Sequence, residues 1–195
     1  MIESHHQPIW QAARPYLQTR SNDTHTFYCY GFARQLLAVH TNARADIVLT
    51  AVLLHDVGWS TVPEDKQLLS FGPHMRYPEL RRQHEVEGAR IAREILTGLA
   101  VDTAVIEAAA AIIDGHDTRP EILSLEDALV KDADKLWRYT PFGLETVGGW
   151  FGFSPEEQLA LLEKWLEHRF YTDTAVHMAR GLLAYLQIRM ADMTA

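Results

Sequence analysis

The sequence lacks several features that mark membrane, secreted and disulfide-linked proteins. Its single cysteine, Cys29, excludes an internal disulfide and is compatible with a reducing compartment. Residues 1–6 have neither the basic start nor the apolar core of a signal peptide. The apolar run at residues 47–54 is far too short to cross a bilayer. We therefore expect a cytoplasmic protein that does not enter a membrane.

A surplus of positive charge is also missing. The chain holds 18 Lys and Arg residues against 26 Asp and Glu residues, which gives a net charge of −8 at pH 7. Binding to a phosphate backbone needs clustered basic side chains, so we expect no nucleic-acid partner. A small anionic substrate would have to be attracted locally, by metal ions or by a few basic side chains.

Alternating apolar and polar residues, the pattern of a β-strand, do not occur over several positions anywhere, and there is no internal repeat. We therefore predict an all-α fold. With 195 residues, 47% of them hydrophobic, the chain suffices for one domain over residues 1–195, whereas two domains would each have a small core. Capping residues and apolar spacing predict helices at about 23–39, 46–58, 78–96, 102–113, 124–137, 154–166 and 176–190, with Asp23 or Thr24 capping the first.

Two stretches have no clear helical pattern. Residues 60–77 are mostly polar and contain two prolines and a glycine, which predicts a loop of some length. Residues 140–153 contain four glycines, and their pattern predicts no element. Long ordered loops in compact domains are usually functional, so we expect both stretches to shape a binding pocket.

The dipeptide His55–Asp56 directly follows the apolar run 47–54. A carboxylate in that place cannot stay unpaired in a core, because an isolated buried charge costs many kcal/mol unless it meets a partner or a cation. Neighbouring side chains on a helix point about 100° apart, so both could reach one metal ion beside that flank. The alternative is that both side chains only bond backbone groups at a helix end.

Further metal-binding residue types lie on other predicted helices. His25 is in the first turn of its helix, and His84 is followed by Gly88, which would let another element approach closely. His116 follows an apolar run in the same way as His55, and Asp134 lies among apolar neighbours. Each residue alone could be structural, but together they indicate a metal site formed by several helices.

The order His, His-Asp, His, His, Asp resembles the HD-domain superfamily of metal-dependent phosphohydrolases. The similarity covers about residues 23–138, and its best strings are LLHDVG, HEVEGARIAREIL, IIDGH and VKDADKL. The resemblance implies a compact helical bundle with the metal site between helices. The implied metal ligands are His25, His55, Asp56 and Asp134 for the minimal site, with His84 and His116 for a second ion and Asp56 bridging both.

This resemblance implies a hydrolase in which divalent metal ions activate a water against a phosphate ester or nucleotide. Two ions are expected, with Fe or Mn favoured and Mg, Co, Ni or Zn as alternatives, because His and Asp ligands suit several metals. Asp56 would orient the water or take its proton, and Lys135 is the first candidate for a phosphate clamp. With only one ion, His84 or His116 could instead act as an acid or base.

Other members of this superfamily leave an alternative open. The same ligand order resembles the mixed-valent di-iron oxygenases of this fold, which act on small polar or phosphonate substrates, and the ligands do not separate the two chemistries. Trp59 stands where many two-metal members have a lysine, and neither a GYP string nor a Glu-Asp pair directly after the HD turn is present. The chain therefore most resembles small bacterial HD hydrolases of unspecified substrate. Its helices within residues 154–193 would cover the core or form a homodimer face.

Overall fold

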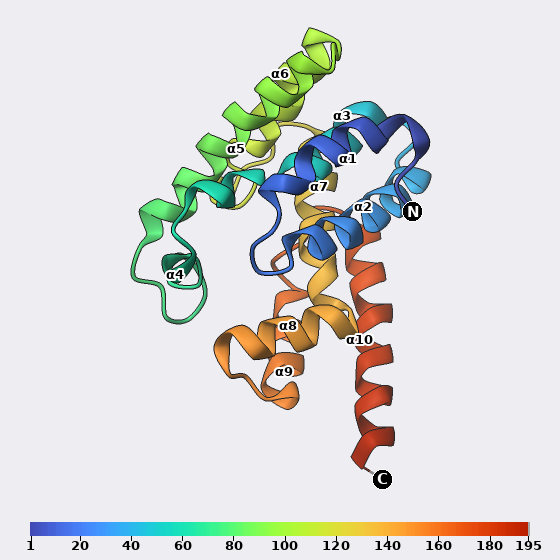
Figure 1. The fold of residues 1–195 in the computed structure, drawn as a ribbon. Helices are drawn as coiled ribbons and strands as arrows, with labels where there is room; N and C mark the ends of the chain where they lie inside the picture. Colours follow the sequence, from blue (N-terminus) through green and yellow to red (C-terminus); the bar gives the residue numbers. More distant parts are fainter. Residues whose placement is uncertain (195) are drawn as a thin grey trace.

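The computed structural model describes residues 1–194, and the side chains of residues 1–192. Within this range the chain forms ten α-helices and four short 3₁₀-helices without a β-strand, which confirms the predicted all-α fold (Figure 1). The α-helices are α1 (Gln7–Ala13), α2 (Asn22–Val39), α3 (Ala45–Leu54), α4 (Glu64–Gln67), α5 (Pro78–Gly98), α6 (Thr103–Ile113), α7 (Leu125–Leu136), α8 (Pro141–Phe151), α9 (Pro155–Trp165) and α10 (Asp173–Thr194). The 3₁₀-helices are η1 (Ser4–His6), η2 (Arg14–Tyr16), η3 (Val57–Thr61) and η4 (Trp137–Tyr139).

Helix α3 lies at the centre of the bundle. It packs against α2, α6 and α7, and all its residues from Ile47 to Leu54 are buried. A helix that is apolar on every side is stable only when other elements surround it, which explains why residues 47–54 show no polar face. The end of this helix therefore delivers His55 and Asp56 into the interior of the molecule.

The segment after α3 crosses α5 at a pair of glycines. A Cβ atom on Gly58 would lie 1.8 Å from the carbonyl oxygen of His84 and 2.5 Å from the backbone nitrogen of Gly88. Only glycine permits this approach, and it holds η3 directly against α5. Gly88 lies at the same crossing, where a Cβ atom would be 3.2 Å from the side chain of Ile113 and 3.4 Å from the carbonyl oxygen of His55.

Two predicted helix boundaries are wrong. Helix α2 begins at Asn22 and not after Asp23 or Thr24, because Arg20 and Ser21 adopt left-handed conformations, with φ of 52° and 59°, that turn the chain into the helix. Helix α3 ends at Leu54 and not at Gly58. Asp56 leaves the helical conformation, with φ of −102° and ψ of 3°, and a 3₁₀-turn follows.

Several predicted helix starts are confirmed by side-chain caps. Asp102 accepts a hydrogen bond of 2.8 Å from the backbone of Ala104, and Ser154 forms a reciprocal capping box with Glu157. At α7, Ser124 accepts from the backbone of Asp127, but the carboxylate of Asp127 does not complete the box. It accepts instead from the backbone of Leu123 (2.8 Å) and from Arg119 (3.1 Å).

The stretches without a helical pattern are more ordered than the sequence suggests. The predicted loop 60–77 includes the end of η3 and the single turn of α4. The glycine-rich residues 140–153 mostly form α8, which starts at Pro141 after Thr140 accepts a hydrogen bond of 3.0 Å from the backbone of Gly143. Capping by Thr140 and the fixed φ of Pro141 account for this helix despite its glycines. Helix α1 was not predicted either.

Helix α10 runs along one side of the bundle and carries the C-terminal end of the chain away from it (Figure 1). Its start is held by Asp132 of α7, whose carboxylate accepts hydrogen bonds from the backbone of Tyr171 (2.8 Å) and Thr172 (3.0 Å). Thus α10 covers α2, α7 and η4, and α9 packs against α8 and α10. None of the described helices is both long and apolar enough to cross a membrane.

Candidate metal centre

The structure brings together all six predicted ligand residues, which come from α2, the turn after α3, α5, the turn after α6, and α7. His55 and His116 each follow a buried helix and share one hydrogen-bond pattern. Nδ1 of His55 donates to the carbonyl of Val52 (2.7 Å), and Nδ1 of His116 donates to the carbonyl of Ile113 (2.9 Å). This bond places a proton on Nδ1, so Nε2 is the ring nitrogen that faces the site. The Asp56 carboxylate outweighs burial and raises the pKa of His116 to about 9, so a metal would bind His116 by displacing the proton from Nε2.

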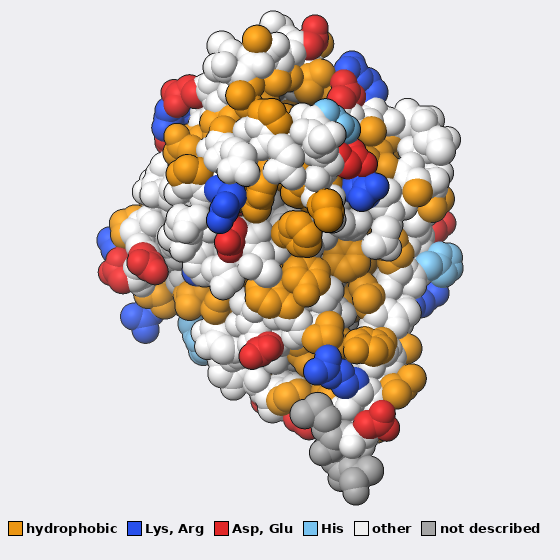
Figure 2. Space-filling view, turned by 45° about the vertical axis from the view of Figure 1, so that its right-hand side comes forward, with side chains coloured by type: hydrophobic (Ala, Val, Ile, Leu, Met, Phe, Trp, Pro, Cys, Tyr) orange, Lys and Arg blue, Asp and Glu red, His pale blue; other side chains and the backbone are white. Residues whose placement is uncertain are grey.

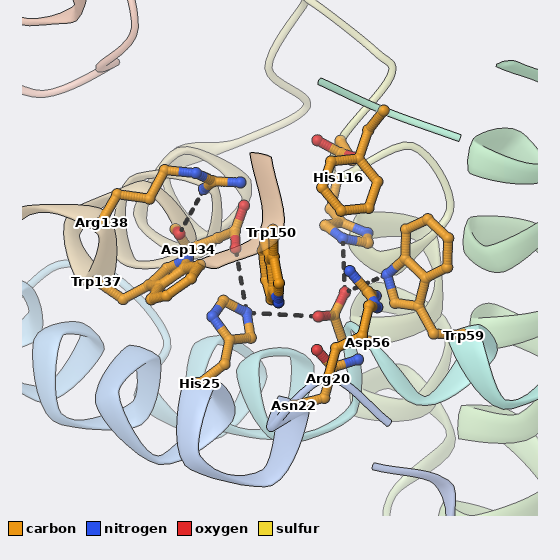
Figure 3. Close-up of a pocket in the computed structure, with 12 residues that line it drawn as sticks. Arg20, Asn22, His25, Asp56, Trp59, His116, Asp134, Trp137, Arg138 and Trp150 are labelled. Atoms are coloured by element: carbon orange, nitrogen blue, oxygen red, sulfur yellow. Dashed lines mark hydrogen bonds and ion pairs between the residues drawn. The ribbon is translucent and has the colours of Figure 1, made fainter. Parts of the chain in front are cut away.

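Asp56 lies at the centre of the cluster (Figure 3). Its Oδ2 is 3.5 Å from Nε2 of His25, whereas its Oδ1 is 3.7 Å from Nε2 of His116 and 3.9 Å from Nε2 of His84. Oδ1 also accepts a hydrogen bond of 3.1 Å from the indole of Trp59. The two oxygens of one carboxylate therefore face different histidines, as a bridging ligand requires.

Asp134 lies on the other side of His25. Its Oδ1 is 3.3 Å from Nε2 of His25 and 3.7 Å from Nε2 of His55, and these two imidazole nitrogens are 2.9 Å apart. The thiol of Cys29 is 3.6 Å from the His25 ring. Three nitrogen and oxygen atoms thus converge in one place, with a sulfur atom nearby.

His84 is fully buried, and neither of its ring nitrogens has a hydrogen-bond partner among the described residues. Its ring stacks on Trp59, with centroids 4.0 Å apart and planes 11° apart. A buried imidazole without partners pays the full cost of desolvation, which a bound metal ion would offset. This unpartnered side chain is the strongest local sign that the cluster accommodates a cation.

The surroundings of the cluster set the protonation states of its two carboxyl groups and of His84. Burial favours the neutral form of Asp56 and Asp134, but the neighbouring histidines outweigh it and hold the pKa of both carboxyl groups below the usual range. Burial lowers the pKa of His84 to about 4. At neutral pH the site therefore contains two carboxylates and an unprotonated His84, which are the forms that bind divalent ions.

The interatomic distances also fit metal binding. The facing ligand atoms lie between 2.9 and 3.9 Å apart. Atoms bound at about 2.1 Å to one ion lie roughly 3 to 4 Å from each other, so the cluster needs little rearrangement to hold divalent ions. Four imidazoles and two carboxylates exceed the ligand number of one tetrahedral ion. The individual ligand roles and the number of ions stay predictions.

The cluster forms the floor of a cavity of about 40 Å³. Sequence reasoning missed several residues that line it, notably Asp117 and the two labelled in Figure 3 as Arg20 and Asn22. Arg20 and Asn22 lie in the turn before α2 and at its first residue, where no motif marks them. Asp117 follows His116, and both its oxygens are 2.6 Å from the guanidinium of Arg81. Its position directly after a predicted ligand was the one signal that could have found it.

A larger groove of about 460 Å³ adjoins this cavity and shares with it Phe71, Asp117, Asp134, Arg138 and Trp150. Lys135 lines the groove, and its ammonium lies 4.6 Å from the centre of the Tyr171 ring. The two stretches expected to shape a pocket both contribute, since Phe71 and Trp150 line the groove as well as the cavity. Four cationic side chains face the groove in all, namely Arg81, Lys135, Arg138 and Arg169.

The HD-domain family model matches residues 22–138 of the chain, a range that contains all six clustered residues. The crystal structure of a predicted HD superfamily hydrolase from an uncultured Thermotogales bacterium is similar, with a TM-score of 0.65 and 18% sequence identity over 97% of this chain and 91% of that one. At this level of identity the similarity shows a shared fold. No curated protein matches the sequence.

Proposed function

Since the chain belongs to the HD-domain family, we propose that it is a metal-dependent hydrolase that cleaves a phosphate ester or a nucleotide. One observation carries the proposal: the clustered histidines and carboxylates adjoin a groove with four cationic side chains, of which Arg81 is paired with Asp117. A net charge of −8 would otherwise repel an anionic substrate, so this local group of cations supports a phosphorylated one.

The residues proposed to hold the metal are His25, His55, Asp56, His84, His116 and Asp134. We expect two ions, with Asp56 shared between them, because its two oxygens face different histidines. Divalent ions bound there would supply an activated water and stabilise the charge that develops on the phosphoryl group. Fe or Mn is favoured, and Mg, Co, Ni or Zn are alternatives.

The side chains of the protein complete the chemistry. The indole of Trp59 donates to Oδ1 of Asp56 and so orients this carboxylate, which would orient the attacking water or accept its proton. Lys135 remains the proposed phosphate clamp, because it follows Asp134 and faces the groove. The aromatic rings of the groove, such as Trp150 and Trp165, would exclude water or stack on a base of the substrate.

A hydrolysis screen tests this proposal. Nucleotides and phosphomonoesters are incubated with the protein and Mn, Fe(II), Mg, Co or Ni, and released phosphate is measured. We expect at least one metal and substrate pair to give activity that Asp56→Ala abolishes, with the exposed His168→Ala as the matched control. Activity that survives Asp56→Ala would refute the site.

The di-iron oxygenase alternative is tested on protein purified without oxygen. Two irons per chain together with dioxygen uptake on reduction, in the absence of phosphate release, would refute hydrolysis. Phosphate release that stops when the metal is chelated, without dioxygen uptake, would support the hydrolase.

A further inference from the structure

Arg20 occupies an unusual place beside the metal centre. Its guanidinium lies over the ring of Trp59, 4.4 Å from the centroid, and close to Phe71 (5.1 Å) and Trp150 (5.4 Å). These rings come from η3, the segment after α4, and α8, so three separate parts of the chain enclose one cation. An arginine stacked among aromatic rings is held in a defined orientation.

A hydrogen bond fixes the guanidinium further. Nε of Arg20 donates to Oε1 of Gln67 at 2.7 Å. Gln67 is itself almost fully buried, and its amide donates to the carbonyls of Trp59 (3.1 Å) and Val62 (3.0 Å). The acceptor is therefore rigid, and Arg20 is preorganised before any ligand arrives.

The outer end of this side chain is left without a partner. Nη2 of Arg20 is buried and makes no hydrogen bond among the described residues, and Arg20 forms no ion pair with a carboxylate in that part of the chain. The amide Nδ2 of Asn22, whose residue is only 2% exposed, is likewise buried and unpartnered. Both side chains line the cavity that Asp56 shares (Figure 3).

Two unpartnered donors, one of them cationic, are costly to bury unless an acceptor fills the space between them and the cluster. Burial lowers the pKa of Arg20 to about 10, so its side chain is still charged at neutral pH. The backbone adds to the cost, because Arg20 and Ser21 are consecutive non-glycine residues with positive φ. This strained turn places Arg20 and Asn22 on the same cavity.

We propose that Arg20 and Asn22 form an oxyanion-binding subsite that holds the phosphate or phosphonate group of the substrate next to the metal centre. The proposal rests on the proposed function in one respect, namely that the reaction occurs in the cavity beside Asp56. A substrate held by this subsite carries a tetrahedral oxyanion at the end that reacts. The cavity of about 40 Å³ has room for a group of roughly three waters in size.

Inorganic phosphate is the probe, titrated by calorimetry into the metal-loaded protein. The metal is required because Asp56, Asp117 and Asp134 line the same cavity and would repel an anion when no cation offsets them. We expect Arg20→Gln to weaken phosphate binding about ten- to hundredfold, the range for losing hydrogen bonds from a charged group. Metal content should stay equal to that of the wild type, and Arg14→Gln, at an exposed arginine, should bind phosphate normally.

A second variant covers the case in which Arg20→Gln does not fold or load metal. Asn22→Asp keeps the shape of the side chain but replaces the unpartnered donor with a negative charge beside Arg20, so it should abolish phosphate binding. If metal-loaded Arg20→Gln or Asn22→Asp binds phosphate with the same affinity as the wild type, the proposal of this subsite is refuted. Failure of the wild type to bind phosphate at millimolar concentration overturns it as well.

These outcomes are separable from those of the activity screen. Phosphate binding that depends on Arg20, in a protein that releases no phosphate from any ester, would keep the subsite and refute hydrolysis. Substrate cleavage by a metal-loaded Arg20→Gln protein with unchanged KM would keep the hydrolase and refute the subsite.

Discussion

At the scale of single residues, the tautomers of the histidines decide which atoms can bind metal. His55 and His116 use Nδ1 to bond the carbonyl three residues earlier, and so each presents Nε2 to the cavity. The spacing is the same in both cases because both histidines follow a buried helix. The sequence shows this pattern as an apolar run that ends in a histidine.

His84 allows a prediction that separates a ligand from a packed ring. In His84→Phe, the new ring should keep the stacking on Trp59 and remove two buried nitrogens without partners. We therefore expect the free energy of unfolding of the metal-free variant to exceed that of the metal-free wild type by about 1 kcal/mol or more. Its Tm should be higher accordingly. Metal content should fall from two ions per chain to one.

Thermal unfolding after chelation and elemental analysis of the loaded protein measure both effects. His168→Phe, at a histidine whose side chain is 76% exposed, is the matched control and should retain both ions. Unchanged metal content in His84→Phe would exclude His84 as a ligand.

At the scale of elements, the site depends on how closely η3 approaches α5. Gly58→Ala would place a methyl group 1.8 Å from the carbonyl oxygen of His84, and that backbone atom cannot move aside cheaply. We expect the variant to lose about 3 kcal/mol or more of stability and to bind less metal, since Asp56 and His84 would separate.

A glycine in open space gives the matched control for this prediction. Gly31 lies within α2, and a Cβ atom added there would have no neighbouring atom within 4 Å, so Gly31→Ala should raise stability by up to about 1 kcal/mol. Chemical denaturation of both variants checks the pair of expectations. Equal stability of Gly58→Ala and the wild type would show that the two elements can separate without cost.

Helix α8 shows why its region resisted prediction from sequence. Its glycines lower the intrinsic helix propensity, and only Thr140 and Pro141 mark a start. Its Trp150 encloses Arg20 together with two rings from distant segments. Which side of α8 faces the cavity depends on its packing against α9 and η4, and no local pattern encodes that.

At the scale of the whole molecule, the metal centre joins five segments that are far apart in sequence, from His25 to Asp134. Each segment contributes a polar side chain that is buried or largely buried in the packed molecule. The metal-bound state should therefore stabilise the entire bundle, because ions that bind only the folded chain shift the folding equilibrium.

Removal of the metal tests this coupling. We expect chelation to lower the free energy of unfolding by about 2.7 kcal/mol when the free metal had been at 100 times its Kd, which corresponds to a fall in Tm of roughly 5 to 10 °C. Scanning calorimetry before and after chelation measures the change, and added metal should restore it. Asp56→Ala serves as the control that chelation should leave unaffected. A Tm that is the same with and without chelator in the wild type would contradict a metal site in the core.

The outer surface is relevant to the alternative that the C-terminal helices form a homodimer face. Hydrophobic side chains occur in several groups on the face seen in Figure 2, between charged residues. Tyr185 and Ile188 of α10 are exposed by 52% and 65%. The pairing of two chains through this helix stays a prediction, as does the cytoplasmic location.

The helical class and the identity of the clustered residues follow from the amino-acid sequence without further information. Apolar periodicity and caps depend on neighbours a few positions away, so α5, α6 and α9 begin where local chemistry predicts. The order of histidines and aspartates could be read directly, because a buried polar residue after an apolar run is conspicuous in one dimension.

The surroundings of those residues depend on how distant parts of the chain pack together. Arg20 and Asn22 carry no motif, and their importance arises from rings and carboxylates that lie 30 or more positions away in the chain. The lack of a hydrogen-bond partner at Nη2 of Arg20 or at the ring of His84, among the residues that the structure describes, is a property of the packed molecule. Such a property depends on which distant groups fold into contact, and for this reason no local pattern in the sequence could reveal it.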